Sequence, residues 1–218
     1  MKNLLTTCLL FVMITNLNAQ QKIAFGPSAG MGVSILNYKR GPYTGLGYKI
    51  GVSSKIKLNR TFFLCPEVYL SRKGFAKFNF NFTELHPVPN NDYSLALHYV
   101  DFCLPVKIKV VNTFYIQTGV QAGYLINATY PGYSDINDYL QDWDFGFIGG
   151  FNWDMENGLG FSILVNAGFF DVNTGKIDEI QAEPYYYNDY SNVEFGKNVL
   201  LTGGIHYLFG KTKGRIIF

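Results

Sequence analysis

The chain has 218 residues and a net charge of +2, with 17% aromatic but only 16% charged residues. Soluble domains usually carry about 25% charged residues, so this chain offers little charge for a water-facing surface. A net charge of +2 also argues against nucleic acid as a partner, because phosphate binding requires a concentrated basic face.

The N-terminal segment has the features of a secretory signal. Lys2 precedes an apolar run from Leu4 to Leu17, and the small Ala19 follows. This order predicts a signal peptide over residues 1–19, cleaved after Ala19. The apolar run is shorter than the ~20 residues of a spanning helix. We therefore expect an exported protein whose residues 20–218 form one domain.

Eight segments with strand character follow the signal. Each is long enough to cross a bilayer as a tilted strand, which takes ~9–11 residues. An even number of antiparallel strands can close into a barrel without an exposed edge. The predicted strands are Ile23–Leu36, Tyr43–Leu58, Phe62–Phe75, Leu97–Val110, Phe114–Asn127, Asp142–Met155, Leu159–Asp171 and Lys197–Phe209.

The predicted connections alternate in length. Short turns fall at Asn59–Thr61, Val111–Thr113 and Glu156–Gly158, whereas 76–96, 128–141 and 172–196 are long loops. The remaining connection, around Asn37–Pro42, is intermediate. Outer-membrane barrels have short periplasmic turns at one end and long extracellular loops at the other. The same end assignment is therefore expected here.

Alternation of apolar and polar residues, with exceptions such as Ile148, indicates that the two faces of each strand meet different surroundings. In Asp142–Met155 one face carries Trp143, Phe145, Phe147, Phe151 and Trp153, and the other carries Asp144, Gly146, Asn152 and Asp154. In Phe114–Asn127 the apolar set is Phe114, Ile116, Val120, Ala122 and Ile126, against Gln117, Gly119, Gln121, Gly123 and Asn127.

Two barrels fit this alternation. A soluble, lipocalin-like barrel turns its apolar face inward, whereas a membrane barrel turns it toward lipid. The polar face here is rich in Gly, Ser, Gln and Asn and lacks the dense Lys and Glu of a water-facing surface. Trp143 and Trp153 also lie at opposite ends of one strand, as two aromatic girdles require. The prediction is an all-β, eight-stranded, antiparallel, up-and-down transmembrane barrel in the outer membrane.

Several strand motifs resemble the PorT-like outer-membrane β-barrel proteins of Gram-negative bacteria. "CPEVYLSRKGF" is similar to the family's P-E-L-x-Y-S-x-x-G, and "YVDFCLPVKIKV" to Y-L-x-I-P-x-L-x-K. "IQTGVQAGYLINA" resembles G-P-x-x-G-Y-L-x-x with Val120 in place of Pro, and "DFGFIGGFNWDMENGLG" resembles the D-F-G strand with its Asn-Gly turn. The resemblance implies the same eight-stranded fold. It also implies a link to type IX secretion, in which the founding member takes part.

Charged residues are expected inside the predicted barrel. One interpretation is a charged conduit for ions or small solutes, and the other is a set of buried pairs that fill a narrow, neutral lumen. The second is favoured because an eight-stranded barrel is just wide enough inside for side chains. The predicted lumen network is Lys49, Glu67, Asp101, Lys107 and Lys109, with Lys55 and Lys57 on the same strand as Lys49.

Neither catalysis nor a cofactor is predicted. His86, His98 and His206 lie outside any nucleophile motif and are assigned to loop or interface positions, and no Cys/His cluster has metal-ligand spacing. Cys65 and Cys103 lie on neighbouring predicted strands. They either form a disulfide or fill the interior as small side chains.

The last long loop is the most distinctive. It holds Tyr185, Tyr186, Tyr187 and Tyr190 among acidic residues. Tyrosine is enriched at binding surfaces, so the loop is either an extracellular binding patch or a lid that buries its own rings. At the opposite end the basic residues should meet lipid phosphates. These residues are Lys55, Lys57, Arg60, Lys107, Lys109, Lys211, Lys213 and Arg215.

These features together predict a monomeric barrel with a structural, binding or assembly role. Its expected partners are outer-membrane lipid and a periplasmic or extracellular protein. A narrow solute channel is the alternative, and a lipid-modifying enzyme is the third possibility.

Overall fold

The computed structural model describes residues 23–38, 41–76, 94–129, 136–137, 140–172 and 195–210. The predicted signal, His86, the tyrosine-rich loop and the basic residues after Gly210 lie outside these ranges. No helix in the described ranges is long and apolar enough to cross a membrane.

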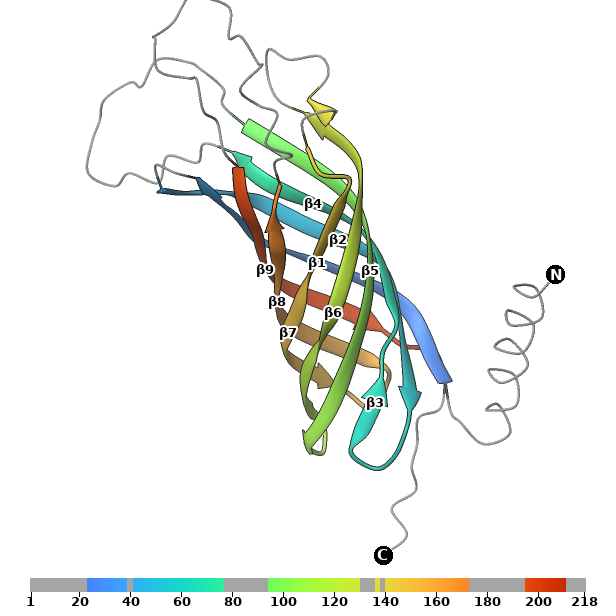
Figure 1. Cartoon of the computed structure of the whole chain (residues 1–218). Coiled ribbons are helices and arrows are strands. Elements are labelled where there is room, and N and C mark those ends of the chain that lie inside the picture. Colours follow the sequence, from blue (N-terminus) through green and yellow to red (C-terminus); the bar gives the residue numbers. More distant parts are fainter. Residues whose placement is uncertain are drawn as a thin grey trace, which may run out of the picture.

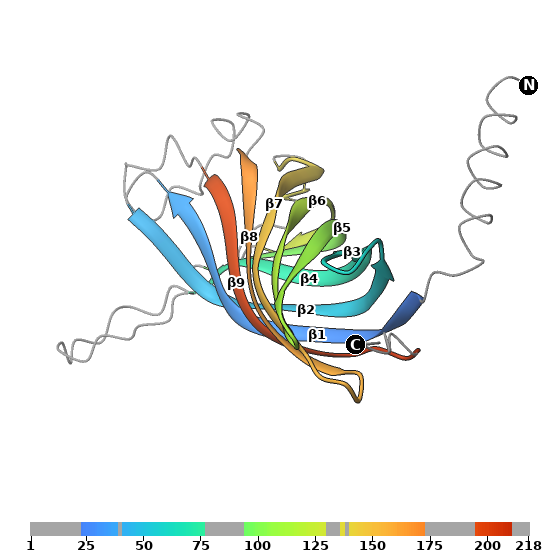
Figure 2. The ribbon, with the colours of Figure 1, turned by 90° about the horizontal axis from the view of Figure 1, so that it is seen from below.

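The strands form one closed antiparallel ring (Figures 1 and 2). Neighbours in sequence pair with each other around the ring, except β3 with β4, and β1 closes the ring by pairing with both β2 and β9. The strands are β1 (Ile23–Tyr38), β2 (Gly41–Lys57), β3 (Phe62–Leu64), β4 (Glu67–Ala76), β5 (Ser94–Val111), β6 (Phe114–Thr129), β7 (Trp143–Asp154), β8 (Leu159–Asp171) and β9 (Phe195–Tyr207). This confirms the predicted all-β, up-and-down architecture.

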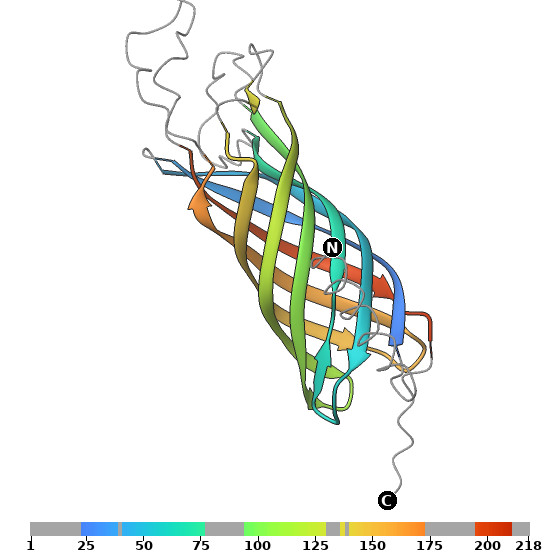
Figure 3. The same cartoon turned by 45° about the vertical axis from the view of Figure 1, so that its right-hand side comes forward.

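One predicted strand is broken in two. β3 and β4 follow each other along a single path between β2 and β5, separated by Cys65 and Pro66 (Figure 3). Pro66 has no N–H to donate to the ladder, so regular pairing stops there. The ring therefore holds eight strand positions, one of which contains two strands.

The short connections fall where the sequence predicted them. Asn59 Oδ1 accepts hydrogen bonds from the backbone N–H groups of Thr61 and Phe62, which shapes the first turn. Gly158 has a φ of 93°, the left-handed conformation that a three-residue hairpin loop with a bulge requires. The connection between β1 and β2 is shorter than expected, because Tyr38 pairs with Gly41 and only residues 39 and 40 lie between the strands.

The apolar face points outward, as predicted for a membrane barrel. On β6, Ile116, Val120 and Ile126 are about half exposed, while Gln117 and Gln121 are buried. β7 and β8 repeat this arrangement, with Phe147 and Ile163 outside. A lipocalin-like barrel would have the reverse orientation, so that alternative is wrong.

Aromatic contacts mark two levels on the outer surface. Trp143 packs edge-on against Tyr124 near the long-loop end, and Trp153 packs edge-on against Phe114 near the short turns. Ten residues at ~3.4 Å rise and ~40° tilt place the two tryptophans roughly 25 Å apart along the barrel axis, the height of an apolar membrane band.

The predicted inward and outward faces are wrong at the long-loop end of β6. The pairing of β5 with β6 shifts by one residue. His98 pairs with Asn127, whereas the next residue, Tyr99, pairs with Leu125, so Ile126 is an extra residue on β6. Such a bulge reverses the alternation beyond it. Asn127 is therefore exposed and Ala128 is buried, whereas the sequence pattern placed Asn127 in the lumen.

Candidate functional site

The inside of the barrel is the candidate site, because most of the buried charged side chains gather there. Four lysines and four carboxylates contribute opposite charges to it, so the described interior is balanced when His206 is neutral. The lysines are Lys49, Lys55, Lys73 and Lys107, and the acids are Glu67, Asp101, Asp144 and Asp154.

Asp154 organises the cluster at the short-turn end. Its Oδ2 lies 2.6 Å from Lys55 Nζ, and its Oδ1 lies 3.3 Å from Lys107 Nζ and 3.0 Å from His206 Nε2. These side chains come from β7, β2, β5 and β9, so one carboxylate joins four strands. Gly160 leaves the space for the imidazole, because a Cβ at this position would collide with the His206 ring.

Aromatic rings close the interior around this cluster. Lys55 Nζ lies 3.9 Å from the ring centroid of Tyr115 and 4.5 Å from that of Phe63. The two rings meet edge-on at 5.5 Å, and Cys65 packs beside them. Cation–π contacts of this kind strengthen as water is excluded, so the ammonium group is held by the rings as well as by Asp154.

A second cluster, nearer the long loops, is centred on Lys73. Its Nζ lies 3.2 Å from Asp101 Oδ1 and 2.9 Å from Asp144 Oδ2, and 4.6 Å above the Tyr99 ring. The Ser71 hydroxyl donates to the other oxygen of Asp101 at 2.6 Å. One lysine thus bridges two carboxylates, which come from β5 and β7, the two strands that flank β6.

Between the two clusters lie Lys49 and Glu67, which form no ion pair. Lys49 Nζ and Glu67 Oε2 are both buried without a hydrogen-bond partner, and the ammonium lies 4.7 Å from the Tyr69 ring centroid. Amide pairs cross the same level. Asn152 donates to Gln117, and Asn166 donates to Gln121.

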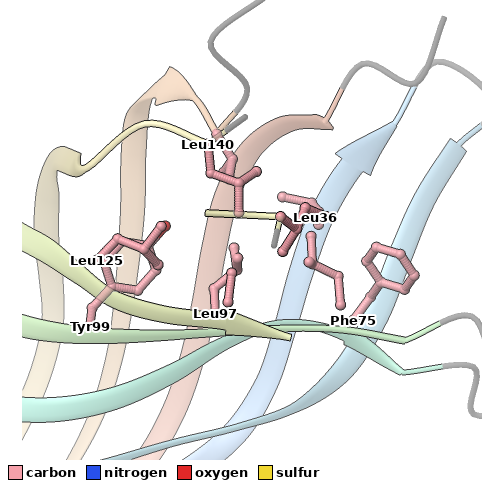
Figure 4. Packing of buried hydrophobic residues seen from close by; sticks show 10 residues of the cluster. Leu36, Phe75, Leu97, Tyr99, Leu125 and Leu140 are labelled. Atoms are coloured by element: carbon pink, nitrogen blue, oxygen red, sulfur yellow. The ribbon is translucent and has the colours of Figure 1, made fainter. Parts of the chain in front are cut away.

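The mouth at the long-loop end is closed by apolar side chains. Figure 4 shows side chains of this cluster, with Leu36, Leu97 and Leu140 near its centre and Tyr99 and Leu125 at one side. The cluster spans several strands and includes two residues of the β6–β7 connection. Its members, called the apolar plug below, are Leu36, Phe75, Leu95, Leu97, Tyr99, Leu125, Ala128, Ile136, Leu140 and Val172.

The sequence predicted part of this network. Lys49, Glu67, Asp101 and Lys107 are buried as expected, but Lys109 is half-buried near the turn end and outside both clusters. Lys73 and His206 were missed. Lys73 shares the inward parity of Glu67 on β4, and this signal could have identified it. Asp144 and Asp154 were placed on the polar face, but their partners on distant strands were not identified.

Other predicted residues are also located. Cys65 and Cys103 are free and buried, so the disulfide alternative is wrong and the small-filler alternative holds. His206 belongs to the interior and not to a loop or interface position, because it contacts Asp154. Lys55 and Lys107 likewise point into the barrel and not toward lipid phosphates. Within the described residues, no group of His, Cys, Asp and Glu could hold a metal ion.

The unpaired Lys49 and Glu67 lead to a stability prediction. Replacing both by apolar residues of similar size, Lys49→Met with Glu67→Leu, should leave the free energy of unfolding unchanged or raise it by about 1–4 kcal/mol, because two desolvated charges are removed together. Glu67→Leu alone should destabilise, since it leaves Lys49 uncompensated. Denaturant unfolding in detergent micelles measures both, and a destabilised double variant would contradict the prediction.

Solved structures similar to this chain include three surface or outer-membrane proteins. Neisserial surface protein A (NspA) superposes with a TM-score of 0.55 at 15% identity, covering 85% of this chain and 97% of that one. The attachment invasion locus protein Ail of Yersinia pestis has a TM-score of 0.43 at 9% identity, with 87% and 99% covered. AlkL has a TM-score of 0.42 at 13% identity, with 89% and 93% covered.

No sequence match was found among curated proteins. Residues 18–173, more than half of the chain, match the profile of a protein family. Its description, an outer membrane protein beta-barrel domain, agrees with the outward apolar face and the polar, filled interior described above. The chain therefore belongs to the outer membrane protein beta-barrel domain family.

Proposed function

We propose that this protein is a closed, non-enzymatic outer-membrane barrel that acts in binding or assembly and does not pass solutes. The observation that supports this role is the filled lumen. An apolar plug occupies the long-loop end, and charge clusters, amide pairs and aromatic rings occupy the levels below it. A conducting pore needs a continuous polar path, and the plug interrupts one.

Planar-bilayer recording tests the closed barrel against the narrow channel. Purified wild-type protein is expected to insert without steady single-channel steps, because ions would have to cross the apolar plug. Leu97→Ala with Leu140→Ala should also stay closed, since the Lys73 and Asp154 clusters remain below. An open porin reconstituted in the same way provides the positive control. Reproducible steps from the wild-type protein would refute the closed barrel and support the channel.

In the cell, we propose a monomer that is exported by its signal at residues 1–19 and surrounded by outer-membrane lipid. Its surface for a protein partner would lie outside the membrane, where the tyrosine-rich loop with Tyr185, Tyr186, Tyr187 and Tyr190 is expected. The resemblance of the strand motifs to PorT-like proteins favours type IX secretion as the assembly process. A deletion strain should then retain type IX cargo inside the cell, and normal cargo release would argue for a different assembly role.

A further inference from the structure

The lipid-facing surface is hollowed where β3 ends and β4 begins. A groove of about 550 Å³ lies there, within the ~300–1,000 Å³ typical of ligand sites. Its outward-facing walls are apolar except for Ser54, whose hydroxyl donates a hydrogen bond to the Pro66 carbonyl. The apolar wall residues include Phe25, Val52, Val68, Phe102, Leu104 and Ala122. We call this hollow the seam groove.

Two prolines on neighbouring strands explain why the groove lies at this position. Pro66 separates β3 from β4, and Pro105 lies on β5 beside the break. The carbonyl of Pro66 accepts bonds from Ser54 N at 3.0 Å and Ser54 Oγ at 2.8 Å, and that of Pro105 accepts one from Cys65 N at 2.9 Å. The backbone acceptors are therefore paired, and neither proline has an N–H to leave exposed to lipid.

The side chains around the break complete the hollow. Val52, Val68 and Ala122 are short, while Phe25, Phe102 and Leu104 are large and about half exposed or more. Glu67 and Cys103, whose side chains belong to the interior face, adjoin the groove where the ladder is interrupted.

The groove lies between the two aromatic levels of the outer surface. Its wall residues Val120 and Ala122 pair with Phe147 and Phe145, which lie between Trp143 and Trp153 on β7. The groove therefore faces the hydrocarbon of the membrane. The groove is also continuous with the apolar belt that contacts lipid, and its outward-facing walls carry no charge.

We propose that the seam groove binds one acyl chain of a membrane phospholipid. The walls offer only van der Waals contact, which suits an alkyl chain, and the site opens to hydrocarbon. An acyl chain bound there fills the groove, and the wall residues gain packing contacts that they lack around an empty groove. The site is independent of the closed lumen, so it holds whether or not the barrel conducts.

Photo-crosslinking tests this proposal directly. The full mature chain is reconstituted in vesicles of a phosphatidylethanolamine that carries a diazirine midway along one acyl chain, illuminated, digested and mapped by mass spectrometry. Adducts at Val52, Val68 and Ala122 are expected to exceed, several-fold, those at equally exposed apolar positions on β8 and β9. An even distribution around the barrel would overturn the proposal.

A matched pair of variants sharpens the test. Ala122→Trp fills the groove and should remove the excess of adducts, while Ala167→Trp makes the same change on β8, away from the groove, and should leave it. Unchanged adducts in Ala122→Trp would contradict the proposal. If Ala122→Trp fails to fold, the wild-type map still decides. A protein dimer in the same vesicles that Ala122→Trp abolishes and Ala167→Trp preserves would show that a second copy, and not lipid, occupies the groove.

Discussion

Asp154→Asn is expected to lower the free energy of unfolding by about 3–5 kcal/mol, because it leaves Lys55 and Lys107 as buried, uncompensated charges. Both ammonium groups lie within ion-pair distance of this one carboxylate, and their side chains are only 5% exposed. Asparagine keeps the size and one acceptor oxygen but removes the charge. The effect therefore reports on electrostatics and not on packing.

Denaturant unfolding in detergent micelles, followed by the gel shift between folded and unfolded barrel, measures this change. Asp171→Asn is the control, because Asp171 is exposed at the end of β8 and its replacement should change stability by less than about 0.5 kcal/mol. Lys73→Met should repeat the large loss, since it leaves Asp101 and Asp144 unpaired.

Replacing Asp154 together with its two lysine partners separates the effect of charge on stability from the effect of side-chain shape. Lys55→Met, Lys107→Met and Asp154→Leu together remove every formal charge of the cluster except that of a protonated His206. This triple variant should recover most of the stability lost in Asp154→Asn. If Asp154→Asn instead behaved like Asp171→Asn, the cluster would be hydrated, and the barrel would be open to water from the turn end.

The sequence was sufficient to predict which way most side chains face. A strand has a period of two, so the alternation around Phe147 and Gln121 identifies the outward and inward sets without any knowledge of pairing. The scarcity of charge and the two tryptophans of β7 then decide between lipid and water. The strand ends and short turns followed from Gly and Asn positions such as Gly158.

Other features depend on pairing that periodicity does not encode. Lys55 meets Asp154 across 99 positions of sequence, and Lys73 meets Asp144 across 71, so only the closed ring brings them together. The bulge at Ile126 reversed the face of Asn127 because one extra residue changes the parity. The break at Pro66 could have been foreseen, since proline cannot donate to the ladder. The groove beside it could not, because it also requires short side chains on three strands, β2, β4 and β6.

The orientation of the apolar face leads to the second large effect. Val165→Arg should lower the free energy of unfolding in phospholipid vesicles by about 2–4 kcal/mol, because arginine would stand on the lipid face near the bilayer midplane. Val165 points outward and pairs with Gly149, about halfway between Trp143 and Trp153 along the barrel.

Val111→Arg provides the matched control, since Val111 is also an exposed valine but lies beside the turn that precedes Phe114. Arginine there can reach the interface, so its cost should fall to about 0–1 kcal/mol. The free-energy cost of the same Val→Arg substitution depends on its depth along the barrel only when lipid surrounds the outer face. Equal, small effects at both positions would mean that water surrounds the outer face, whereas a difference that shrinks in thinner bilayers would locate the hydrocarbon between the two aromatic levels.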